Sequence, residues 1–545
     1  MVKGKKFKKT TSLFLVCFLA ISNIQSVKAE IPKAYWKYQQ PFLNAVEAKN
    51  DTEIVRLGTE IMNVFKDKPL DKDKAGILYS TYDAMYPTYE RQGNYDKAIA
   101  VLKAQIPYGE YLGFKDGVKL AKARVKNIDP MTEVYAVTQN KGSVPYFGMK
   151  NEPKSGTYFG RVFTKDGAVP MEDETAISFY IECFQENIKD YDYLIRDYAD
   201  GKRIIHIALN MPQENDSLKK VVSPDADSYL RDTMAYINSL NTPVLLRIGG
   251  EMNVWQNLAE PSLFKQAFVK IANIARTNAP NVALVFSPND ISNWNVDIDD
   301  YYPGDSYVDW VGVSLYTNKF RSYQNPVAGK DFEEMYYGNG IYANPISKLR
   351  DIVERYGDRN PIIITEGGTG HSIRGGGTDL TGFASNQLNM LYTYVNMVFP
   401  QVKGIIYFDV DLNKNGYVYA FNKNSTVFSK YKSATENNMA FIKNIGTSPY
   451  AYVKASEYSD NLPTVELYTY CAPIGVSSVA VEYTLDGKVL PSQTGSIPYK
   501  CVINSESISK GAFDLKVTVK SGGYTKIKQY ALNKMETGMI TIKQK

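Results

Sequence analysis

The chain has 545 residues, of which 44% are hydrophobic and 22% are charged, with a net charge of +5. This composition is typical of folded globular proteins and excludes a disordered chain. Because one hydrophobic core rarely extends beyond about 250–300 residues, the length predicts about three domains.

The first 29 residues have the pattern of a secretory signal peptide. Five lysines between positions 3 and 9 precede an apolar run from Leu13 to Ile21, and Val27-Lys28-Ala29 fits a signal-peptidase site. The apolar run is too short to span a bilayer, which needs about 20 residues, so a retained anchor is the weaker alternative. We therefore expect residues 1–29 to be removed and the mature protein to be secreted, extracellular or at the cell surface, without an integral membrane segment.

Removal of this signal changes the net charge of the protein. Residues 1–29 hold six lysines and no acid, so a chain of net charge +5 becomes a mature protein of net charge −1. The basic balance therefore belongs to the signal and does not predict nucleic-acid binding.

Metal ligands are scarce in the sequence. The chain has only two histidines, and no metal-ligand spacing is present. The segment from Asp411 to Gly416 resembles the opening of a calcium loop, but Asn422 stands at position twelve, where a bidentate glutamate is required. We expect no metal and no cofactor.

Residues 30–130 show the apolar spacing of helices. Seven apolar residues between Phe42 and Phe65 recur at helical intervals. The stretch from Gly93 to Ile99 resembles the turn and second-helix start of a tetratricopeptide unit. We predict an all-α domain of helical hairpins, tetratricopeptide-like in form, which braces its neighbour or binds a peptide or cell-wall partner.

Residues 131–446 alternate short apolar runs with amphipathic stretches. Continuous runs of Val, Ile, Leu, Phe and Tyr suit parallel strands that are buried on both faces. The eight expected strands are Thr157–Phe163, Ser178–Phe184, Arg203–Asn210, Pro243–Gly249, Val282–Ser287, Val308–Tyr316, Pro361–Thr365 and Gly404–Asp409. Helices are expected over Ser228–Leu240, Ser262–Thr277, Pro345–Tyr356 and Ser385–Val398. The alternation predicts a (β/α)8 TIM barrel; a doubly wound open sheet is the alternative, but no glycine-rich phosphate loop supports it.

Residues 450–545 follow a break at Gly446-Thr447-Ser448-Pro449. Short β segments are expected over Val465–Tyr470, Val479–Thr484, Tyr499–Ile503 and Phe513–Val519, with turn signals between them. We predict an immunoglobulin-like β-sandwich that binds carbohydrate or acts as a spacer. Cys471 and Cys501 lie in this domain and could form a disulfide after export, whereas Cys183 is expected to be a buried small hydrophobe.

Acidic residues end two of the expected barrel strands. Glu251 follows the fourth strand and Glu366 ends the seventh. The active sites of (β/α)8 barrels lie at the C-terminal ends of the strands. Retaining glycoside hydrolysis uses two carboxyl groups about 5–5.5 Å apart, one as nucleophile and one as acid/base. We therefore predict that these two glutamates form a catalytic pair.

The residues around the pair resemble glycoside hydrolase family 26. Arg247, Glu251 and Asn253 match the acid/base motif of the family, and Glu366 ends an Ile-Ile-Ile-Thr-Glu-Gly-Gly segment as the family's nucleophile does. Residues 309–313, which lead to Tyr316, resemble its sixth strand, whose tyrosine contacts the nucleophile. The resemblance covers the middle of the chain and implies a β-mannanase-like retaining glycosidase, with Glu251 as acid/base and Glu366 as nucleophile.

Two positions depart from the pattern of that family. Gly250 stands where the family has a histidine that contacts a sugar hydroxyl, and Phe408 is the nearest aromatic residue where a tryptophan ends strand eight. Both changes affect the sugar-binding shell and leave the carboxylate pair intact.

Further site residues are expected at the strand ends and in the loops that follow them. The side chains expected to contact sugar are Arg247, Asn253, Trp255, Asn289, Trp294, Phe408 and Asp409. Tyr316 is expected to orient Glu366. His206 is interpreted as a core residue, and His371 lies in a glycine-rich loop, residues 371–377, that could act as a lid.

The sequence thus predicts a secreted, retaining endo-β-glycanase that hydrolyses a polysaccharide, with β-mannan ahead of β-glucan or xylan. Two alternatives use the same barrel. One is a catalytically weak or inactive glycan-binding envelope protein, which Gly250 motivates. The other is a hydrolase of the cell's own envelope polysaccharide. In either case the flanking domains could associate the protein with the cell envelope.

Overall fold

The computed structural model describes residues 31–163, 169–212, 216–254, 260–290, 296–319, 343–373, 378–411, 416–443, 446–473 and 478–545. The chain divides into two compact units. One comprises the residues up to Pro130 together with Ser521–Tyr524, and the other comprises Met131–Lys520 together with Thr525–Lys545. Among the described residues, no helix has the length and apolarity that a membrane crossing requires.

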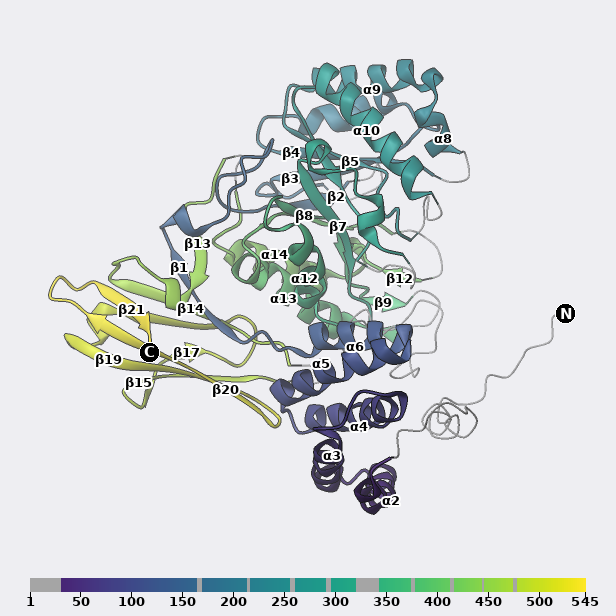
Figure 1. The fold of residues 1–545 in the computed structure, drawn as a ribbon. Helices are drawn as coiled ribbons and strands as arrows, with labels where there is room; N and C mark the ends of the chain where they lie inside the picture. Colours follow the sequence, from purple (N-terminus) through teal and green to yellow (C-terminus); the bar gives the residue numbers. More distant parts are fainter. Residues whose placement is uncertain are drawn as a thin grey trace. The chain divides into compact units, whose positions relative to one another are not determined.

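The N-terminal unit is helical, as predicted. Its helices are α2 (Lys33–Glu47), α3 (Asp51–Phe65), α4 (Lys72–Arg91), α5 (Tyr95–Leu112) and α6 (Lys115–Ile128), shown in purple and blue in Figure 1. Each helix packs against the next one in the chain. Asn50, Asp71 and Asn94 cap three of the helices by accepting a backbone N–H from the first turn. The all-α prediction is confirmed, and the tetratricopeptide-like form stays a prediction.

Eight parallel strands form a closed barrel in the order β11-β2-β3-β4-β5-β6-β7-β8. The strands are β2 (Tyr158–Val162), β3 (Ala176–Glu182), β4 (Ile204–Asn210), β5 (Val244–Ile248), β6 (Val282–Phe286), β7 (Trp310–Tyr316), β8 (Ile362–Gly368) and β11 (Val402–Tyr407). Each overlaps one of the eight expected strands. The barrel prediction is confirmed, and the open doubly wound sheet is wrong.

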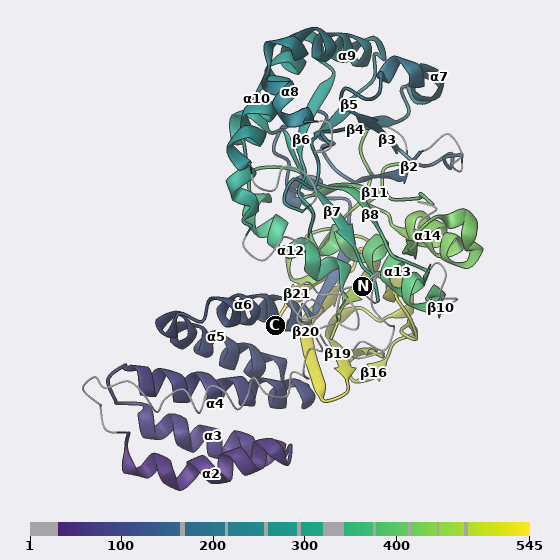
Figure 2. The same ribbon diagram turned by 90° about the vertical axis from the view of Figure 1, so that its right-hand side faces the viewer.

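Helices surround the barrel strands in both views of the ribbon (Figures 1 and 2). They are α7 (Asp192–Ile195), α8 (Ser217–Val222), α9 (Asp227–Ser239), α10 (Pro261–Asn278), α12 (Pro345–Tyr356), α13 (Thr381–Val398) and α14 (Ser425–Asn437). Outward-facing strand residues such as Ile207, Leu246 and Ile364 share one core with the helices. A separate cluster that includes Leu245 and Trp310 fills the barrel interior, as a packed barrel requires.

Two five-stranded sheets follow the barrel. The chain after the barrel supplies nine of their ten strands: β13 (Ala451–Lys454), β14 (Thr464–Tyr470), β15 (Ala480–Leu485), β16 (Lys488–Val489), β17 (Ser492–Gln493), β18 (Tyr499–Asn504), β19 (Gly511–Ser521), β20 (Tyr524–Lys534) and β21 (Ile540–Gln544). The Tyr483 hydroxyl lies 2.7 Å from the Thr469 hydroxyl and donates to the Tyr499 carbonyl, which joins the sheets face to face. The C-terminal β region is therefore present, and its immunoglobulin-like topology stays a prediction.

One strand of this region comes from ahead of the barrel. β1 (Glu133–Thr138) pairs antiparallel with both β13 and β14, in a sheet of order β13-β1-β14-β18-β17. The region expected to be only barrel, residues 131–446, therefore also supplies the sheet with a strand. Its partners lie more than 300 residues away in the chain, a separation that local periodicity does not report.

The possible disulfide between Cys471 and Cys501 is wrong. In the ladder between β14 and β18, Cys501 lies opposite Leu467, four residues before Cys471. Four strand residues span about 13 Å, whereas a disulfide needs Cα atoms within about 7 Å. Cys471 instead accepts a hydrogen bond from Thr132 at 3.0 Å, and Cys183 is buried, as expected.

A small sheet follows strand β8. It consists of β9 (Ser372–Ile373), β10 (Thr378–Asp379) and β12 (Tyr417–Val418), in the order β10-β9-β12. This sheet ties the segment after Glu366 to the segment after β11, so both segments are held at the same side of the barrel mouth.

Candidate active site

Arg247 on β5 points into the barrel and organises the site. Its side chain is 2% exposed. The guanidinium group donates from Nη1 to Glu366 Oε2, from Nε to Ser287 Oγ at 3.1 Å, and from Nη2 to Ser314 Oγ at 2.6 Å. The three nitrogen atoms of the guanidinium group thus donate to three different side chains, and these hydrogen bonds hold the guanidinium plane in one orientation.

The Glu366 carboxylate accepts hydrogen bonds at both oxygens. Oε2 receives Arg247 and the Tyr180 hydroxyl at 2.7 Å, and Oε1 receives the Tyr316 hydroxyl at 3.0 Å. Burial works to raise the pKa of Glu366, but the Arg247 charge and these three donors outweigh it and hold the pKa below its ordinary value. This carboxylate is therefore ionised at neutral pH.

Glu251 occupies an unusual backbone position after β5. Its φ is +59°, in the left-handed region that side-chain-bearing residues rarely adopt. Its backbone N–H donates to the Ser287 carbonyl at 2.9 Å, and its Oε1 accepts from Asn289 Nδ2 at 2.6 Å. Such backbone strain, of order 1–3 kcal/mol, persists where the surroundings fix a residue, and it is common at functional sites.

Burial and the negative charge of Glu366 raise the pKa of Glu251 to about 7, although Arg247 and Asn289 oppose the shift. The two carboxyl groups interact, so the shifts belong to the pair. At neutral pH the pair holds one ionised carboxylate beside one group that can still carry a proton. Two acids whose environments separate their pKa values can perform opposite roles in one reaction.

Gly250 lies directly under the guanidinium group. A Cβ at this position would overlap the Nε, Cζ and Nη2 atoms of Arg247. The space of a side chain at position 250 is therefore already occupied by the arginine that binds Glu366. The glycine departs from the family pattern, yet it leaves no hole in the site.

Asn253 and Asn289 form a reciprocal pair. Asn289 N–H donates to Asn253 Oδ1 at 2.8 Å, and Asn253 Nδ2 donates to the Asn289 carbonyl at 3.0 Å. Asn253 is fully buried, and its two hydrogen bonds hold the backbone of Asn289 in place. The Asn289 side chain in turn donates to Glu251. Behind them, a buried ion pair between Asp290 and Lys348 at 2.5 Å anchors the segment after β6 to helix α12.

The two residues expected from the eighth strand have different surroundings. Phe408 contacts Tyr180 and Tyr316 edge to face, with ring centroids 6.3 and 6.0 Å apart, so it packs against the residues that bind Glu366. Asp409 accepts from Arg161 at 2.7 Å and from the Phe421 N–H at 2.6 Å. Its two oxygens are therefore held by protein donors, and it belongs to a neighbouring ion-pair network.

The two histidines lie away from the carboxylates. His206 is fully buried inside the barrel beside Ser178, 2.7 Å from its hydroxyl, and burial lowers the pKa of His206 to about 3. It is therefore a neutral core residue, as expected. His371 is buried against the Ala420 carbonyl. Trp255, Trp294, residues 374–377 of the glycine-rich loop and residues 412–415 of the calcium-like segment lie outside the described residues.

Three residues of the site were not predicted: Tyr180, Ser287 and Ser314. Each interrupts an otherwise apolar strand or its end. In β3, Ser178, Tyr180 and Glu182 alternate with apolar residues, and that period of two marks a polar interior face at this part of the barrel. The alternation was available in the sequence as a signal for Tyr180.

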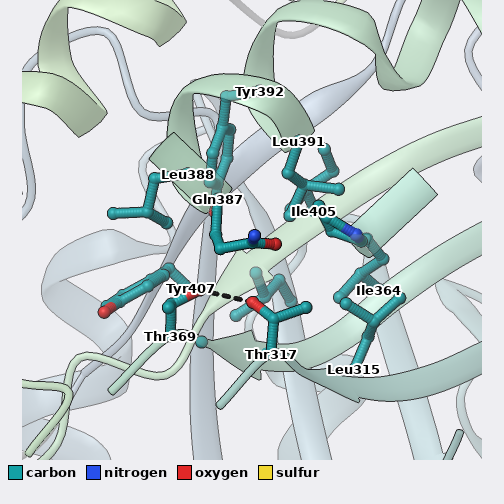
Figure 3. A pocket seen from close by; sticks show the side chains of 14 residues that line it. Leu315, Thr317, Ile364, Thr369, Gln387, Leu388, Leu391, Tyr392, Ile405 and Tyr407 are labelled. Atoms are coloured by element: carbon teal, nitrogen blue, oxygen red, sulfur yellow. Dashed lines mark hydrogen bonds between the residues drawn. The ribbon is translucent and has the colours of Figure 1, made fainter. Parts of the chain in front are cut away.

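A pocket behind the site belongs to the hydrophobic core. It is lined by Leu315, Ile364 and Tyr407 from the strands and by Gln387 and Leu391 from α13, and Thr317 and Thr369 hydrogen-bond at its edge (Figure 3). These strand residues belong to the core between strands and helices, whereas Glu366 faces the barrel interior. The pocket is therefore separate from the carboxylate pair. Over the described part of the chain, no cluster of three or more His, Cys, Asp or Glu side chains could hold a metal ion.

Several solved structures are similar to this chain at low identity. The GH26 β-mannanase BoMan26A from Bacteroides ovatus is 15% identical, over 56% of this chain and 95% of its own, with a TM-score of 0.37. The endo-β-1,4-mannanase from Thermotoga petrophila is 10% identical, over 71% and 99%, with a TM-score of 0.35. A β-glucuronidase from Bacteroides uniformis is 13% identical, over 71% and 48%, with a TM-score of 0.35. TM-scores this low support no inference about this chain.

The sequence itself gives the more specific likeness. No curated protein matches the chain. The model of glycosyl hydrolase family 26 matches residues 209–368, a segment that begins in β4 and ends with β8. It includes Arg247, Glu251, Tyr316 and Glu366, the residues on which the resemblance was predicted. Over residues 209–368 this chain is therefore glycosyl hydrolase family 26-like, and the predicted resemblance is confirmed.

Proposed function

We propose that this protein is a retaining glycoside hydrolase in which Glu366 is the nucleophile and Glu251 is the acid/base. The single observation that carries the proposal is the difference between the two carboxyl groups. Glu366 is held ionised by Arg247, Tyr180 and Tyr316, whereas the pKa of Glu251 is raised to about 7. A nucleophile must be ionised and a general acid must be protonated, and this pair meets both needs at neutral pH.

The first half-reaction forms a glycosyl ester. An ionised Glu366 oxygen attacks the anomeric carbon, the bond from that carbon to the leaving oxygen breaks, and Glu251 gives its proton to that oxygen. Oε1 is the better attacking atom because it accepts only from Tyr316, whereas Oε2 accepts from both Arg247 and Tyr180. Arg247 and Tyr180 then keep the second oxygen of the carboxyl group in place.

The second half-reaction releases the sugar. Glu251, now ionised, takes a proton from water, and that water attacks the same anomeric carbon and breaks its bond to Glu366. Both glutamates return to their starting protonation states. Asn289 holds the Glu251 carboxyl through its Oε1 in both steps, so the same group can give and then take a proton from a fixed position.

The substrate and the location of the enzyme extend the proposal. The likeness to glycosyl hydrolase family 26 supports a polysaccharide substrate, and we favour a β-mannan, then a β-glucan or xylan, cleaved within the chain. The N-terminal signal pattern supports secretion and a position outside the cell or at its surface. A purely glycan-binding role is less favoured, because Gly250 accommodates Arg247 and both carboxyl groups are in place.

Hydrolysis of a substrate panel tests the proposal. The panel contains β-mannan, glucomannan, β-xylan, lichenan and envelope polysaccharide, each incubated with wild type, Glu366→Gln and Glu251→Gln. We expect wild type to release reducing ends from at least one polymer and Glu366→Gln to lose about 10⁴-fold or more in rate. Full activity of Glu366→Gln on a polymer that wild type cleaves would overturn the mechanism. Glycan binding by wild type with no turnover of any polymer would favour the binding role.

A further inference from the structure

Glu182 and Asn210 form a polar pair at the C-terminal ends of two neighbouring barrel strands. They lie opposite each other in the register of β3 and β4. Asn210 Nδ2 donates to Glu182 Oε1 at 2.8 Å. Both side chains are partly exposed, as is Tyr180 two residues earlier in β3, whereas His206, four residues before Asn210 in β4, is fully buried inside the barrel. The pair is therefore on the open side of the carboxylate site.

The strand register fixes the distance of this pair from the nucleophile. Tyr180 is level with Ala208 on β4 and with Arg247 on β5, and its hydroxyl binds Glu366. Glu182 lies two residues further along β3, on the same face of the strand as Tyr180 and about 7 Å nearer the mouth. When a sugar ring is bound at Glu366, Glu182 and Asn210 therefore lie beside that ring or beside the next ring of the glycan.

The turn after β3 is built to fix Glu182. The Glu182 backbone N–H donates to Glu186 Oε2 at 2.7 Å, and Tyr191 donates to the other oxygen of Glu186. Within this turn Phe184 has a φ of +64°, a rare conformation for a bulky residue. Glu251, which follows β5, also has a positive φ, of +59°. Strain of this kind at two strand ends indicates that both ends hold side chains in required positions.

The pair keeps unused acceptors. From the described residues, Glu182 Oε2 and Asn210 Oδ1 receive no hydrogen bond. A carboxylate and an amide oxygen are acceptors, so they match donors such as the hydroxyl groups of a sugar. The carboxylate adds a negative charge to a mouth in which the charge of ionised Glu366 is already balanced by Arg247, and this added charge disfavours an anionic sugar.

We infer that Glu182 and Asn210 bind hydroxyl groups of an uncharged sugar beside the cleavage point and select neutral glycan chains over chains that carry carboxylates. The inference rests on the proposed glycosidase function and adds the charge class of the substrate. The simpler reading is a structural pair that joins β3 to β4. That reading predicts lower stability on mutation but no change in sugar affinity or in charge selection.

Binding is measured first, in a variant that cannot hydrolyse the glycan. The Glu366→Gln protein is titrated calorimetrically with a neutral oligosaccharide of the polymer found in the panel, or with mannohexaose if no polymer is cleaved. We expect Glu366→Gln/Glu182→Ala and Glu366→Gln/Asn210→Ala to bind about 10-fold more weakly or worse, as expected for a lost hydrogen bond to a charged or buried polar group. The control is Glu366→Gln/Asp225→Asn, which removes an exposed acid and should leave Kd unchanged. Unchanged Kd in both pair variants would overturn the inference.

Charge selection is the second readout. The ratio of kcat/KM on a neutral polymer to kcat/KM on its carboxymethylated form is compared for wild type, Glu182→Gln and Asp225→Asn. We expect this ratio to fall about 5- to 10-fold in Glu182→Gln, because one charge near a cleft contributes about 1 kcal/mol at this range. The ratio should not change in Asp225→Asn. An unchanged ratio in Glu182→Gln would overturn charge selection, whereas absence of turnover in wild type would instead count against the proposed function and leave the binding test decisive.

Discussion

Two buried arginine–carboxylate networks belong to the barrel domain, one inside the barrel and one between strand β2 and helix α14, and they differ in how completely their acids are paired. On one side, Arg161 binds Glu174 through Nε at 2.7 Å and Nη2 at 3.1 Å, and binds Asp409 through Nη1 at 2.7 Å. The Tyr431 hydroxyl and two backbone N–H groups, of Met171 and Phe421, supply further donors to the two acids. All four carboxylate oxygens in this network have a donor.

The second network also contains one arginine, two acids and tyrosine donors, but its two acids are paired to different extents. Arg247 binds Glu366 directly, and Tyr180 and Tyr316 complete the donors of that acid. Glu251 has no direct ion pair with Arg247 among the described contacts, and burial and the charge of Glu366 raise its pKa to about 7 against the opposing effects of Arg247, Asn289 and Ser314. Removing one partner from a fully paired buried network destabilises the fold, because a charge is left buried without its counterion, whereas an incompletely paired acid keeps a proton that can be transferred.

Replacement of the two arginines by methionine separates these roles. Arg161→Met leaves Glu174 and Asp409 buried without their cation, so we expect a loss of about 3–5 kcal/mol in the free energy of unfolding. Arg247→Met should lower kcat/KM by about 10²–10³-fold, because the transition-state charge and the Glu366 orientation both lose a donor. Denaturant unfolding and steady-state kinetics measure the two effects. Equal kinetic losses in both variants would contradict the division of roles.

Replacement of Gly250 by histidine introduces the residue that is typical of the family. Its Cβ would overlap the Arg247 guanidinium group, so the arginine must move away from Glu366. We expect kcat/KM to fall by about 100-fold, as happens when a catalytic group moves by about 1 Å. The acid limb of the pH profile should also move up, because Glu366 loses its cation. An increase in activity would show that the glycine is a defect and not an adaptation.

Replacement of one tyrosine in each network gives a matched pair. Tyr180→Phe removes a donor from Glu366 and should reduce kcat/KM by roughly 10-fold, since a hydrogen bond to a charged group contributes about 1.5–3 kcal/mol and two donors remain. Tyr431→Phe removes a donor from Glu174 and should lower stability by a similar energy with little change in kcat/KM. The comparison fails if the Tyr431 variant loses more activity than the Tyr180 variant while still folded.

If Glu366 and Glu251 have the proposed roles, the pH dependence of kcat/KM should report both acids. Activity should fall as the pH drops below the ordinary glutamate pKa of about 4.3, because Glu366 must be ionised and its pKa is lowered. It should also fall as the pH rises through about 7, because Glu251 must carry a proton. Glu251→Gln, assayed with an aryl glycoside whose leaving group needs no proton, should lose the upper limb. Persistence of that limb would assign it to another group.

The sequence identified more of the residues that surround Arg247 than of those that surround Arg161. Glu251, Glu366 and Tyr316 lie at strand ends, where a position in the chain implies a position at the barrel mouth. Tyr180 was missed because it lies within a strand, where a tyrosine is easily interpreted as core. Asp409 was expected to contact sugar because it follows the eighth strand, but Arg161, distant in the chain, holds it.

The prediction of the fold from sequence was limited in the same way, because contacts between distant segments leave no local pattern. The eight barrel strands and four of the barrel helices were predicted because each has a local apolar run or a helical apolar period. The place of β1 in the C-terminal sheet and the separation of Cys471 from Cys501 depend on pairings between distant segments, which no local pattern contains. Local pattern therefore determined the elements, and long-range contacts determined their partners.

The central claim is that Glu366 forms a covalent bond to the sugar while Glu251 moves the proton. The most direct test is intact-protein and peptide mass spectrometry of Glu251→Ala after brief incubation with an activated aryl glycoside of the sugar that wild type cleaves. The first half-reaction needs no acid with such a leaving group, and the second lacks its base, so we expect a one-glycosyl adduct on the peptide that contains Glu366. Turnover by wild type without an adduct, or with an adduct on another residue, would contradict the account.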